Sequence, residues 1–142
     1  MSDTVGMKLE YEVSAADFSS AGEASSNIKK VLRQLGIDNG LIRRVAICTY
    51  EAEINIAIHS LGGQIIVNIC NDRIEIIAQD RGPGIADIEL AMKSGYSTAS
   101  SAVRELGFGA GMGLPNMKKC CDVFYIDSKV NEFTYVKMIL NL

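Results

Sequence analysis

Several features that would indicate a nucleic-acid or membrane partner are missing from this 142-residue sequence. The formal net charge is −3 and the pI is about 5.1, and no run of Lys and Arg concentrates positive charge in one segment. A nucleic-acid-binding surface usually has such a concentration, because it must neutralise phosphates. No stretch approaches the roughly 20 continuous apolar residues of a membrane helix, and the first four residues do not open a signal peptide. We therefore expect a cytoplasmic protein with no direct contact with nucleic acid or membrane.

Patterns of metal-binding cysteine and histidine are also lacking. Cys48, Cys70, Cys120 and Cys121 form no C-x-x-C pair, and His59 is the single histidine. A structural zinc site needs closely spaced Cys and His ligands, and thiols inside cells normally stay reduced. We therefore expect reduced, structural thiols. The adjacent pair at 120 and 121 leaves a redox-sensing role open.

Hydrophobic periodicity predicts a single α+β domain over residues 1–142. With 48% hydrophobic residues the chain can bury one core, and it is too short for two ordinary domains. Alternating apolar and polar side chains indicate strands, and apolar stripes at helical spacing indicate helices. The expected strands cover 7–13, 64–70, 73–79, 123–127 and 133–140, with an Asn71-Asp72 hairpin turn. The expected helices cover 17–35 with Asp17 as cap, 41–59 with Asp38 or Asn39 as cap, and 114–121, with short helical stretches at 87–93 and 102–106.

Two polar side chains share one face of the largely apolar helix expected at 41–59. Glu51 and Asn55 are four residues apart, which places them one helical turn apart. An asparagine oxygen can enter a Mg²⁺ coordination shell, and a nearby carboxylate can accept a proton from an attacking hydroxyl group. Glu53 is expected on another face, in solvent. Taken alone, the pair is more readily explained as a satisfied polar pair on a helix surface.

A second polar group follows the strand expected at 73–79. The segment D-R-G-P-G at 80–84 places Asp80 at a strand end, followed by Gly82 and Gly84. Ligand sites are commonly built at strand ends. A fixed carboxylate can accept a hydrogen bond from the adenine N6 amine, and glycine lets the backbone approach a flat base closely. An ordinary turn is the alternative explanation.

A third group is a loop with glycine at every second position immediately before the helix expected at 114–121. Its glycines are Gly107, Gly109, Gly111 and Gly113. Free N–H groups in such a loop, together with the positive end of the following helix, can bind a diphosphate or triphosphate. The spacing matches neither the Rossmann fingerprint nor the P-loop. A flexible connector is the alternative explanation.

The order of these groups resembles that of a known superfamily. E-x-x-x-N on a helix, D-x-G-x-G after a strand and G-x-G-x-G before a helix resemble the GHKL ATP-binding proteins, which include gyrase, histidine kinases and the mismatch-repair ATPase. The resemblance covers roughly residues 40–128. The segments 87–92, 95–98 and 111–115 look like those of the small bacterial anti-sigma-factor serine/threonine kinases. That family implies a two-layer sandwich, in which helices cover one face of a mostly antiparallel mixed sheet.

The resemblance also implies roles for individual residues. Asn55 would hold Mg²⁺, Glu51 would act as the catalytic base, and Asp80 would bind adenine. His59 would be a phosphate neighbour or a structural residue. The remaining residues implied in nucleotide binding are Gly82, Gly84, Ser97, Thr98, Gly107, Gly109, Gly111, Met112, Gly113, Leu114 and Thr134.

Two segments depart from the family pattern. The stretch 97–106 makes the lid longer than in close relatives, and its Arg104 could reach a phosphate or lie in solvent. Near the C-terminus the family usually has a glycine followed by Gly-Thr, whereas this chain has V-N-E-F-T at 130–134 and keeps only Thr134. These departures bear on phosphate transfer more than on nucleotide binding.

Two functional hypotheses follow. The first is an ATP- and Mg²⁺-dependent serine/threonine kinase that phosphorylates a STAS-type antagonist protein. Its further partner would be a sigma factor or a regulatory phosphatase, and it would assemble as a homodimer. The second is a non-catalytic module in which ATP closes the lid and controls a protein-binding face. A histidine-kinase catalytic domain would need a dimerisation helix pair, and a gyrase-type ATPase would need a transducer domain. Neither fits this length.

Overall fold

A computed structural model describes residues 5–15, 22–93 and 113–142. Within them, five strands form one sheet in the order β1-β2-β3-β5-β4. All four strand pairings are antiparallel. The strands are β1 Val5–Val13, β2 Gly63–Cys70, β3 Arg73–Arg81, β4 Val123–Lys129 and β5 Phe133–Asn141.

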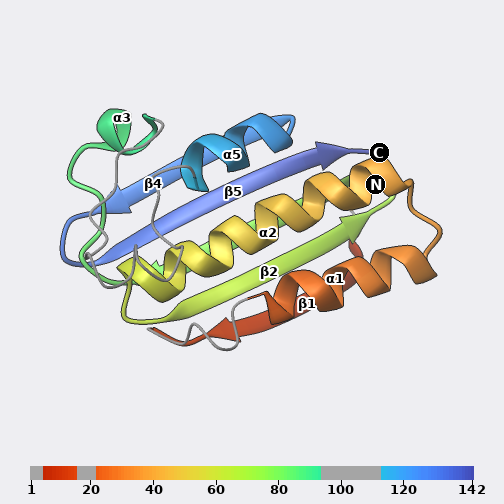
Figure 1. Cartoon of the computed structure of the whole chain (residues 1–142), viewed down its shortest axis with the longest axis horizontal. Coiled ribbons are helices and arrows are strands. Elements are labelled where there is room, and N and C mark those ends of the chain that lie inside the picture. Colours follow the sequence, from red (N-terminus) through yellow and green to blue (C-terminus); the bar gives the residue numbers. More distant parts are fainter. Residues whose placement is uncertain (1–4, 16–21, 94–112) are drawn as a thin grey trace.

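The helices lie on one face of this sheet (Figure 1). They are α1 Glu23–Gln34, α2 Asn39–His59, α3 Ile88–Ala91 and α5 Gly113–Cys120. Helix α2 runs between α1 and α5 and packs against both. This arrangement confirms the predicted two-layer sandwich with helices on one face, and the sheet, which was expected to be mixed and mostly antiparallel, is antiparallel in all described pairings. None of the described helices is long and apolar enough to cross a membrane.

Alternation along the strands decides which side chains face the helices. Strand β5 alternates between partly and fully buried positions, and β2 and β3 do the same along most of their length. Because successive side chains point to opposite faces, one set forms the core. Full burial of a large aliphatic side chain contributes about 1.5–3 kcal/mol. The fully buried core residues include Ile28, Leu32, Val45, Ile65, Val67, Ile74, Ile76, Met117, Met138 and Leu140.

The predicted element boundaries agree with the structure for the second helix and the hairpin. Asp38 caps α2, since its Oδ2 accepts hydrogen bonds from the N–H groups of Gly40 and Leu41 at 3.0 and 3.3 Å. Strands β2 and β3 pair from Gly63 with Asp80 to Ile69 with Ile74, which places the turn at the predicted Asn71-Asp72.

The prediction for the first helix was wrong at its start. Helix α1 begins at Glu23, and its N-cap is Gly22, which has φ 98° and makes no side-chain capping hydrogen bond. Glycine adopts this conformation without steric cost, so the chain enters the helix there. Asp17, the predicted cap, lies outside the described residues. The predicted stretch 102–106 also lies outside them, whereas the expected stretch 87–93 contains α3 with Asp87 as cap.

All four cysteines are free thiols. Cys48 and Cys70 are buried, and Cys120 and Cys121 are partly buried. Burial raises the pKa of the Cys48 and Cys121 thiols, so both groups favour the neutral, unreactive form.

Candidate nucleotide-binding and catalytic site

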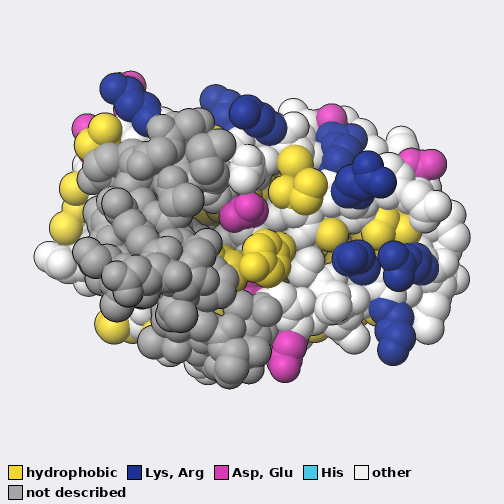
Figure 2. Space-filling view, in the orientation of Figure 1, with side chains coloured by type: hydrophobic (Ala, Val, Ile, Leu, Met, Phe, Trp, Pro, Cys, Tyr) yellow, Lys and Arg dark blue, Asp and Glu magenta, His cyan; other side chains and the backbone are white. Residues whose placement is uncertain are grey.

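One end of the molecule, on the left in Figure 1, gathers the elements that carry the candidate site residues. These are the C-terminal ends of α2 and β3, the turn between β4 and β5, and the start of α5. In the same orientation, Figure 2 shows Lys and Arg side chains over the other half of the helix layer. The exposed cationic residues of these helices are Lys30, Arg33, Arg43, Lys118 and Lys119.

Glu51 faces the start of α5. Its Oε2 accepts a hydrogen bond from Nδ2 of Asn116 at 3.1 Å. A Cβ atom built on Gly113 would lie 3.6 Å from the other carboxylate oxygen of Glu51. The carboxylate is partly buried between two helices, which limits its rotamers. Sequence reasoning missed Asn116, because its role depends on a contact 65 residues away along the chain.

Asn55 lies one turn further along α2 and is also only partly buried. Residues on either side of it, at positions 54, 56 and 57, are buried. Asn55 is thus a partly buried polar residue between buried apolar ones, and the four-residue spacing places it on the same side of α2 as Glu51. An amide oxygen beside a carboxylate is the kind of donor set that a magnesium ion accepts.

Asp80 sits near the end of β3 and faces the helix layer. It continues the series of buried residues Ile74, Ile76 and Ala78, which share one face of the strand. Its Oδ1 accepts a hydrogen bond from the backbone N–H of Thr134 at 3.2 Å. Burial raises the pKa of Asp80 to about 6, although the Thr134 N–H and the charge of Arg81 act in the opposite direction. A carboxyl group with this pKa changes charge just below neutral pH.

Gly63 makes room for Asp80. The two residues are partners in the β2–β3 pairing. A Cβ on Gly63 would lie 2.2 Å from the backbone oxygen of Gln79 and 2.9 Å from Cβ of Asp80. No other residue fits without moving the backbone. No motif in the sequence singled out Gly63, because its contact with Asp80 depends on the register of β2 and β3.

Gly82 and Gly84 pack against neighbouring backbone. A Cβ on Gly82 would lie 3.0 Å from Cα of Ser60. Gly84 has φ 71°, and a Cβ there would lie 2.4 Å from the backbone oxygen of Lys129. Both glycines therefore let this segment approach the end of α2 and the β4–β5 turn closely.

Residues of the β4–β5 turn hold the glycine segment in place. The N–H of Asn131 donates to the oxygen of Pro83 at 2.8 Å, and the N–H of Gly82 donates to the oxygen of Glu132 at 3.3 Å. Asn131 has φ 65°. Asparagine is among the few residues that adopt this left-handed conformation readily. The chain therefore makes a left-handed turn at Asn131 without a glycine.

Ser128 and Thr134 form a small hydrogen-bonded group behind Asp80. Thr134 is only 6% exposed, and its Oγ1 lies 3.1 Å from Oγ of Ser128. The Ser128 hydroxyl donates to the oxygen of Phe133 at 2.8 Å and accepts from the N–H of Ile85 at 2.7 Å. It thus joins β4, β5 and the chain after Gly84. No sequence signal singled out Ser128, since one serine in a strand carries no motif.

Glu53 contradicts the expectation that it would lie in solvent. It is only 5% exposed, and its Oε2 accepts a hydrogen bond from the N–H of Ala24 at 3.3 Å. The prediction was wrong because α1 covers this face of α2. His59, near the C-terminal end of α2, is partly buried, and burial lowers its pKa, which keeps the imidazole neutral near pH 7.

The structure describes only some of the residues that were predicted for the lid and the glycine loop. Gly113 is the first residue of α5, and Leu114 is buried in the core, so Leu114 has only its backbone to offer a ligand. The residues that lie outside the described chain are Ser97, Thr98, Arg104, Gly107, Gly109, Gly111 and Met112.

Comparison with known proteins gives the family of this chain. No protein-family model matches the sequence. The serine/threonine-protein kinase RsbT of Bacillus subtilis (strain 168) is 33% identical over 115 residues, which cover 78% of this chain and 80% of RsbT. The chain belongs to the RsbT family of serine/threonine-protein kinases. This result confirms the predicted family of small bacterial anti-sigma-factor serine/threonine kinases.

The fold of this RsbT-family chain also occurs in a solved structure. A chain in the crystal structure of the SiaB–SiaC complex from Pseudomonas aeruginosa superimposes with a TM-score of 0.63. The match covers 93% of this chain and 88% of that chain, at 12% sequence identity. At this identity the likeness establishes a shared fold, and it agrees with the antiparallel sheet and one-sided helix layer described above.

Proposed function

We propose that this RsbT-family chain binds ATP with Mg²⁺ and transfers the γ-phosphate to a serine or threonine of a STAS-domain antagonist protein. The observation that carries the proposal is the placement of Asp80. Its partly buried carboxyl group faces the helix layer, beside the gap that Gly63 leaves and close to the glycine turn at 82–84. A carboxylate held in this way can accept a hydrogen bond from the exocyclic amine of adenine.

The nucleotide phosphates would extend from Asp80 toward Glu51 and the start of α5. A helix start presents free N–H groups and the positive end of the helix dipole, which favour an anion. Gly113 occupies this start beside Glu51. The glycine loop at 107–113 leads directly into α5 and would close over the phosphates as the predicted lid.

The donor set on α2 fits a magnesium ion. Asn55 offers an amide oxygen, and Mg²⁺ commonly takes one or two protein oxygens together with phosphate oxygens and waters. When bound, the ion would neutralise charge on the phosphates. Glu51 would orient the attacking hydroxyl group and accept its proton, and the hydrogen bond from Asn116 would hold the carboxylate in position.

The partner proposal rests on the family and on the charge of the surface. A cationic helix layer in a protein of net charge −3 suits a partner with an acidic surface. We propose a STAS-domain antagonist as the substrate and a sigma factor or a regulatory phosphatase as a further partner. A homodimer is the proposed assembly.

A phosphotransfer assay tests the function. The purified chain is incubated with ATP, Mg²⁺ and the STAS-domain protein encoded beside its gene, and phosphoserine or phosphothreonine is measured by mass spectrometry. We expect one modified residue. Asp72→Asn serves as a control, because Asp72 is exposed in the β2–β3 turn, away from the candidate site, where it pairs with the neighbouring Arg73. Wild-type protein that binds ATP but never transfers phosphate would support a non-catalytic switch instead.

A further inference from the structure

A pocket of about 600 Å³ lies between β1, α1 and α2. It is separate from the candidate nucleotide site. Glu53, which lines it, is two residues from both Glu51 and Asn55, and two residues correspond to about 200° around a helix. The pocket is therefore on the opposite side of α2. Its lining residues include Tyr11, Glu23, Ala24, Asn27, Glu53 and Ala57.

Glu53 caps a helix to which it does not belong. Gly22, the N-cap of α1, supplies no side-chain hydrogen bond. Oε2 of Glu53 accepts one from the N–H of Ala24 instead, at 3.3 Å. A buried helix start needs such partners for its N–H groups, so α2 contributes directly to the stability of α1.

The second oxygen of Glu53 has no partner in the described part of the chain. Oε1 is buried and makes no hydrogen bond there, although Glu53 as a whole is only 5% exposed. Leaving a buried charged group partly unpaired is costly. A donor from outside the described residues would remove this cost.

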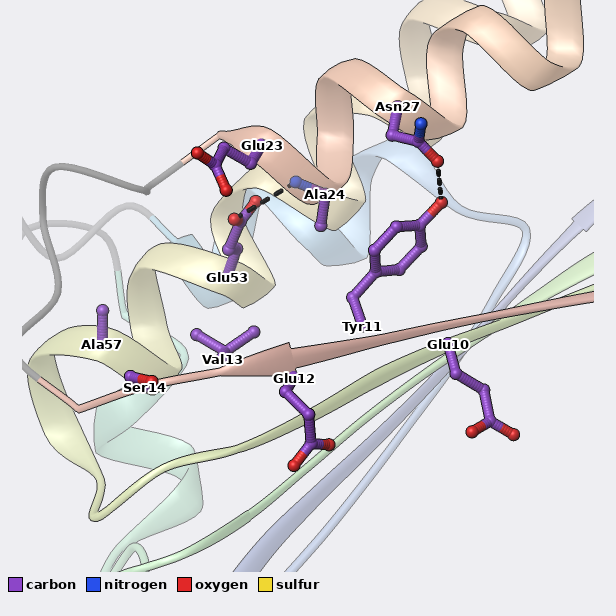
Figure 3. Close-up of a pocket in the computed structure, with 10 residues that line it drawn as sticks. All are labelled: Glu10, Tyr11, Glu12, Val13, Ser14, Glu23, Ala24, Asn27, Glu53 and Ala57. Carbon is purple, nitrogen blue, oxygen red and sulfur yellow. Dashed lines mark hydrogen bonds between the residues drawn. The ribbon is translucent and has the colours of Figure 1, made fainter.

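The charges around the pocket favour a cationic donor. The pocket is lined by four glutamates and, among the described residues, by no Lys, Arg or His. Figure 3 shows that Glu23 and Glu53 bring their carboxylates close together, whereas Glu10 and Glu12 point to the other side of β1. Burial raises the pKa of Glu53, and the negative charge of Glu23 raises it further, although the backbone N–H groups of Ala24, Ser25 and Gly22 act in the opposite direction. A cation between the two carboxylates would offset the repulsion between Glu23 and Glu53.

An aromatic ring and an amide complete the lining. Tyr11 points from β1 toward α1, on the same side of the strand as Glu53, and its hydroxyl donates to Oδ1 of Asn27. This hydrogen bond fixes the ring at the edge of the pocket that Tyr11 lines. Cations are attracted to tyrosine faces by the ring quadrupole.

We propose that this pocket binds a guanidinium group, supplied by an arginine side chain of a partner protein. Guanidinium is planar, stays charged and carries five N–H donors in a fixed fork. It can donate to Oε1 of Glu53 and to the carboxylate of Glu23 together while stacking on Tyr11. An ammonium group lacks both the fork and the plane. The proposal does not depend on phosphate transfer, but its partner is the STAS-domain protein of the proposed function.

Titration with two small isosteric probes tests this. N-acetyl-arginine amide and N-acetyl-citrulline amide have the same shape, but citrulline is neutral. Binding is followed through the backbone amide signals of Ala24 and Ala57 in ¹⁵N–¹H spectra. We expect saturable shifts with the arginine probe and none with the citrulline probe. N-acetyl-lysine amide should bind about tenfold more weakly, because it lacks the bidentate geometry.

Two variants and a control locate the site. Glu23→Gln and Glu53→Gln should each weaken arginine binding at least about tenfold. Asp127→Asn, an exposed change on β4 with the same loss of charge, should leave it unchanged. Glu53→Gln removes part of the cap of α1 and can destabilise the fold. If Glu53→Gln unfolds, binding to Glu23→Gln is the result that decides. Equal shifts with citrulline, or unaltered binding to Glu23→Gln, would overturn the proposal.

A peptide arm distinguishes the source of the group. An arginine-containing peptide from the STAS partner should compete with N-acetyl-arginine amide, and its arginine-to-citrulline version should not. If the free arginine probe binds but neither that peptide nor the intact partner competes with it, the assignment to a partner side chain is wrong.

Discussion

Glu51 of α2 accepts a hydrogen bond from Asn116 of α5, with 3.1 Å between Oε2 and Nδ2. This contact joins the central helix to the helix that starts directly after the glycine loop. A carboxylate that is to accept a proton must be held within hydrogen-bonding reach of the reacting group. The position of α5 therefore bears on the orientation of Glu51.

Glu51→Gln should abolish most phosphate transfer. Glutamine keeps the shape and can still bond to Asn116, but it cannot act as a base. We expect kcat to fall by about 10²–10⁴, while the affinity for ATP measured by fluorescent-nucleotide titration changes by less than about threefold. A matched loss of kcat and of ATP affinity would place Glu51 in nucleotide binding instead.

Asp80→Asn should weaken ATP binding, since the amide presents donors as well as an acceptor to the adenine amine. We expect a loss of about tenfold or more, consistent with one charged hydrogen bond. In the wild type, affinity should also fall as pH is lowered through about 6, where Asp80 takes up a proton. The variant should lose this pH dependence. Calorimetric titration between pH 5 and 8 measures both effects, and unchanged affinity in the variant would remove Asp80 from the site.

The same carboxyl group should lower the stability of the ligand-free protein above pH 6. The folded pKa of Asp80, about 6, is raised from the usual 3.8, so the folded state holds the proton more tightly than the unfolded state. Stability from this group is therefore present below pH 3.8 and is lost as pH rises through 6. Asp80→Asn should raise the free energy of unfolding at pH 8 by on the order of 1 kcal/mol, and the gain should vanish near pH 4. Urea unfolding measures the free energy of unfolding at each pH. If Asp80→Asn gains the same stability at pH 4 and pH 8, the raised pKa of Asp80 is not the cause.

Gly84→Ala should destabilise the glycine turn more than a matched change elsewhere. The new Cβ would lie 2.4 Å from the oxygen of Lys129, in addition to the strain of φ 71°. Gly36→Ala is the control, because Gly36 has φ 74° but nothing within 4 Å of its Cβ position. We expect about 1–2 kcal/mol for Gly36→Ala and at least about 1 kcal/mol more for Gly84→Ala. Thermal unfolding measures both losses of stability. If Gly84→Ala and Gly36→Ala lose the same stability, the turn accommodates the new Cβ without an energetic cost.

Ser128→Ala should loosen the contact between the β4–β5 turn and the segment after Gly84. The change leaves the N–H of Ile85 without its partner and removes the hydrogen bond to Phe133. We expect a loss of about 1–3 kcal/mol in the free energy of unfolding and faster exchange of the Ile85 amide hydrogen. Ser128→Thr, which keeps the hydroxyl group, serves as the control. If the alanine variant exchanges as slowly as wild type, another group satisfies this N–H.

Local patterns predicted most of the elements because their causes are local. The β2–β3 hairpin follows from alternation on both sides of Asn71-Asp72, and the start of α2 follows from Asp38, whose side chain bonds to N–H groups two and three residues ahead. The start of α1 could not be predicted in this way. Its capping carboxylate comes from Glu53, 29 residues after Ala24, and local sequence carries no sign of that contact.

The candidate site likewise has features that follow from local sequence and features that depend on tertiary contacts. The sequence by itself determined the two-layer fold class, the family and the order of the three polar groups, since periodicity, glycine and capping residues act over a few positions. The tertiary structure alone decided that Gly63 makes room for Asp80, that Thr134 donates to it across 54 residues, and that Ser128 joins the turn behind it. These contacts depend on strand register and on the packing of helices against the sheet. Both are set by the whole core, and no short segment specifies them.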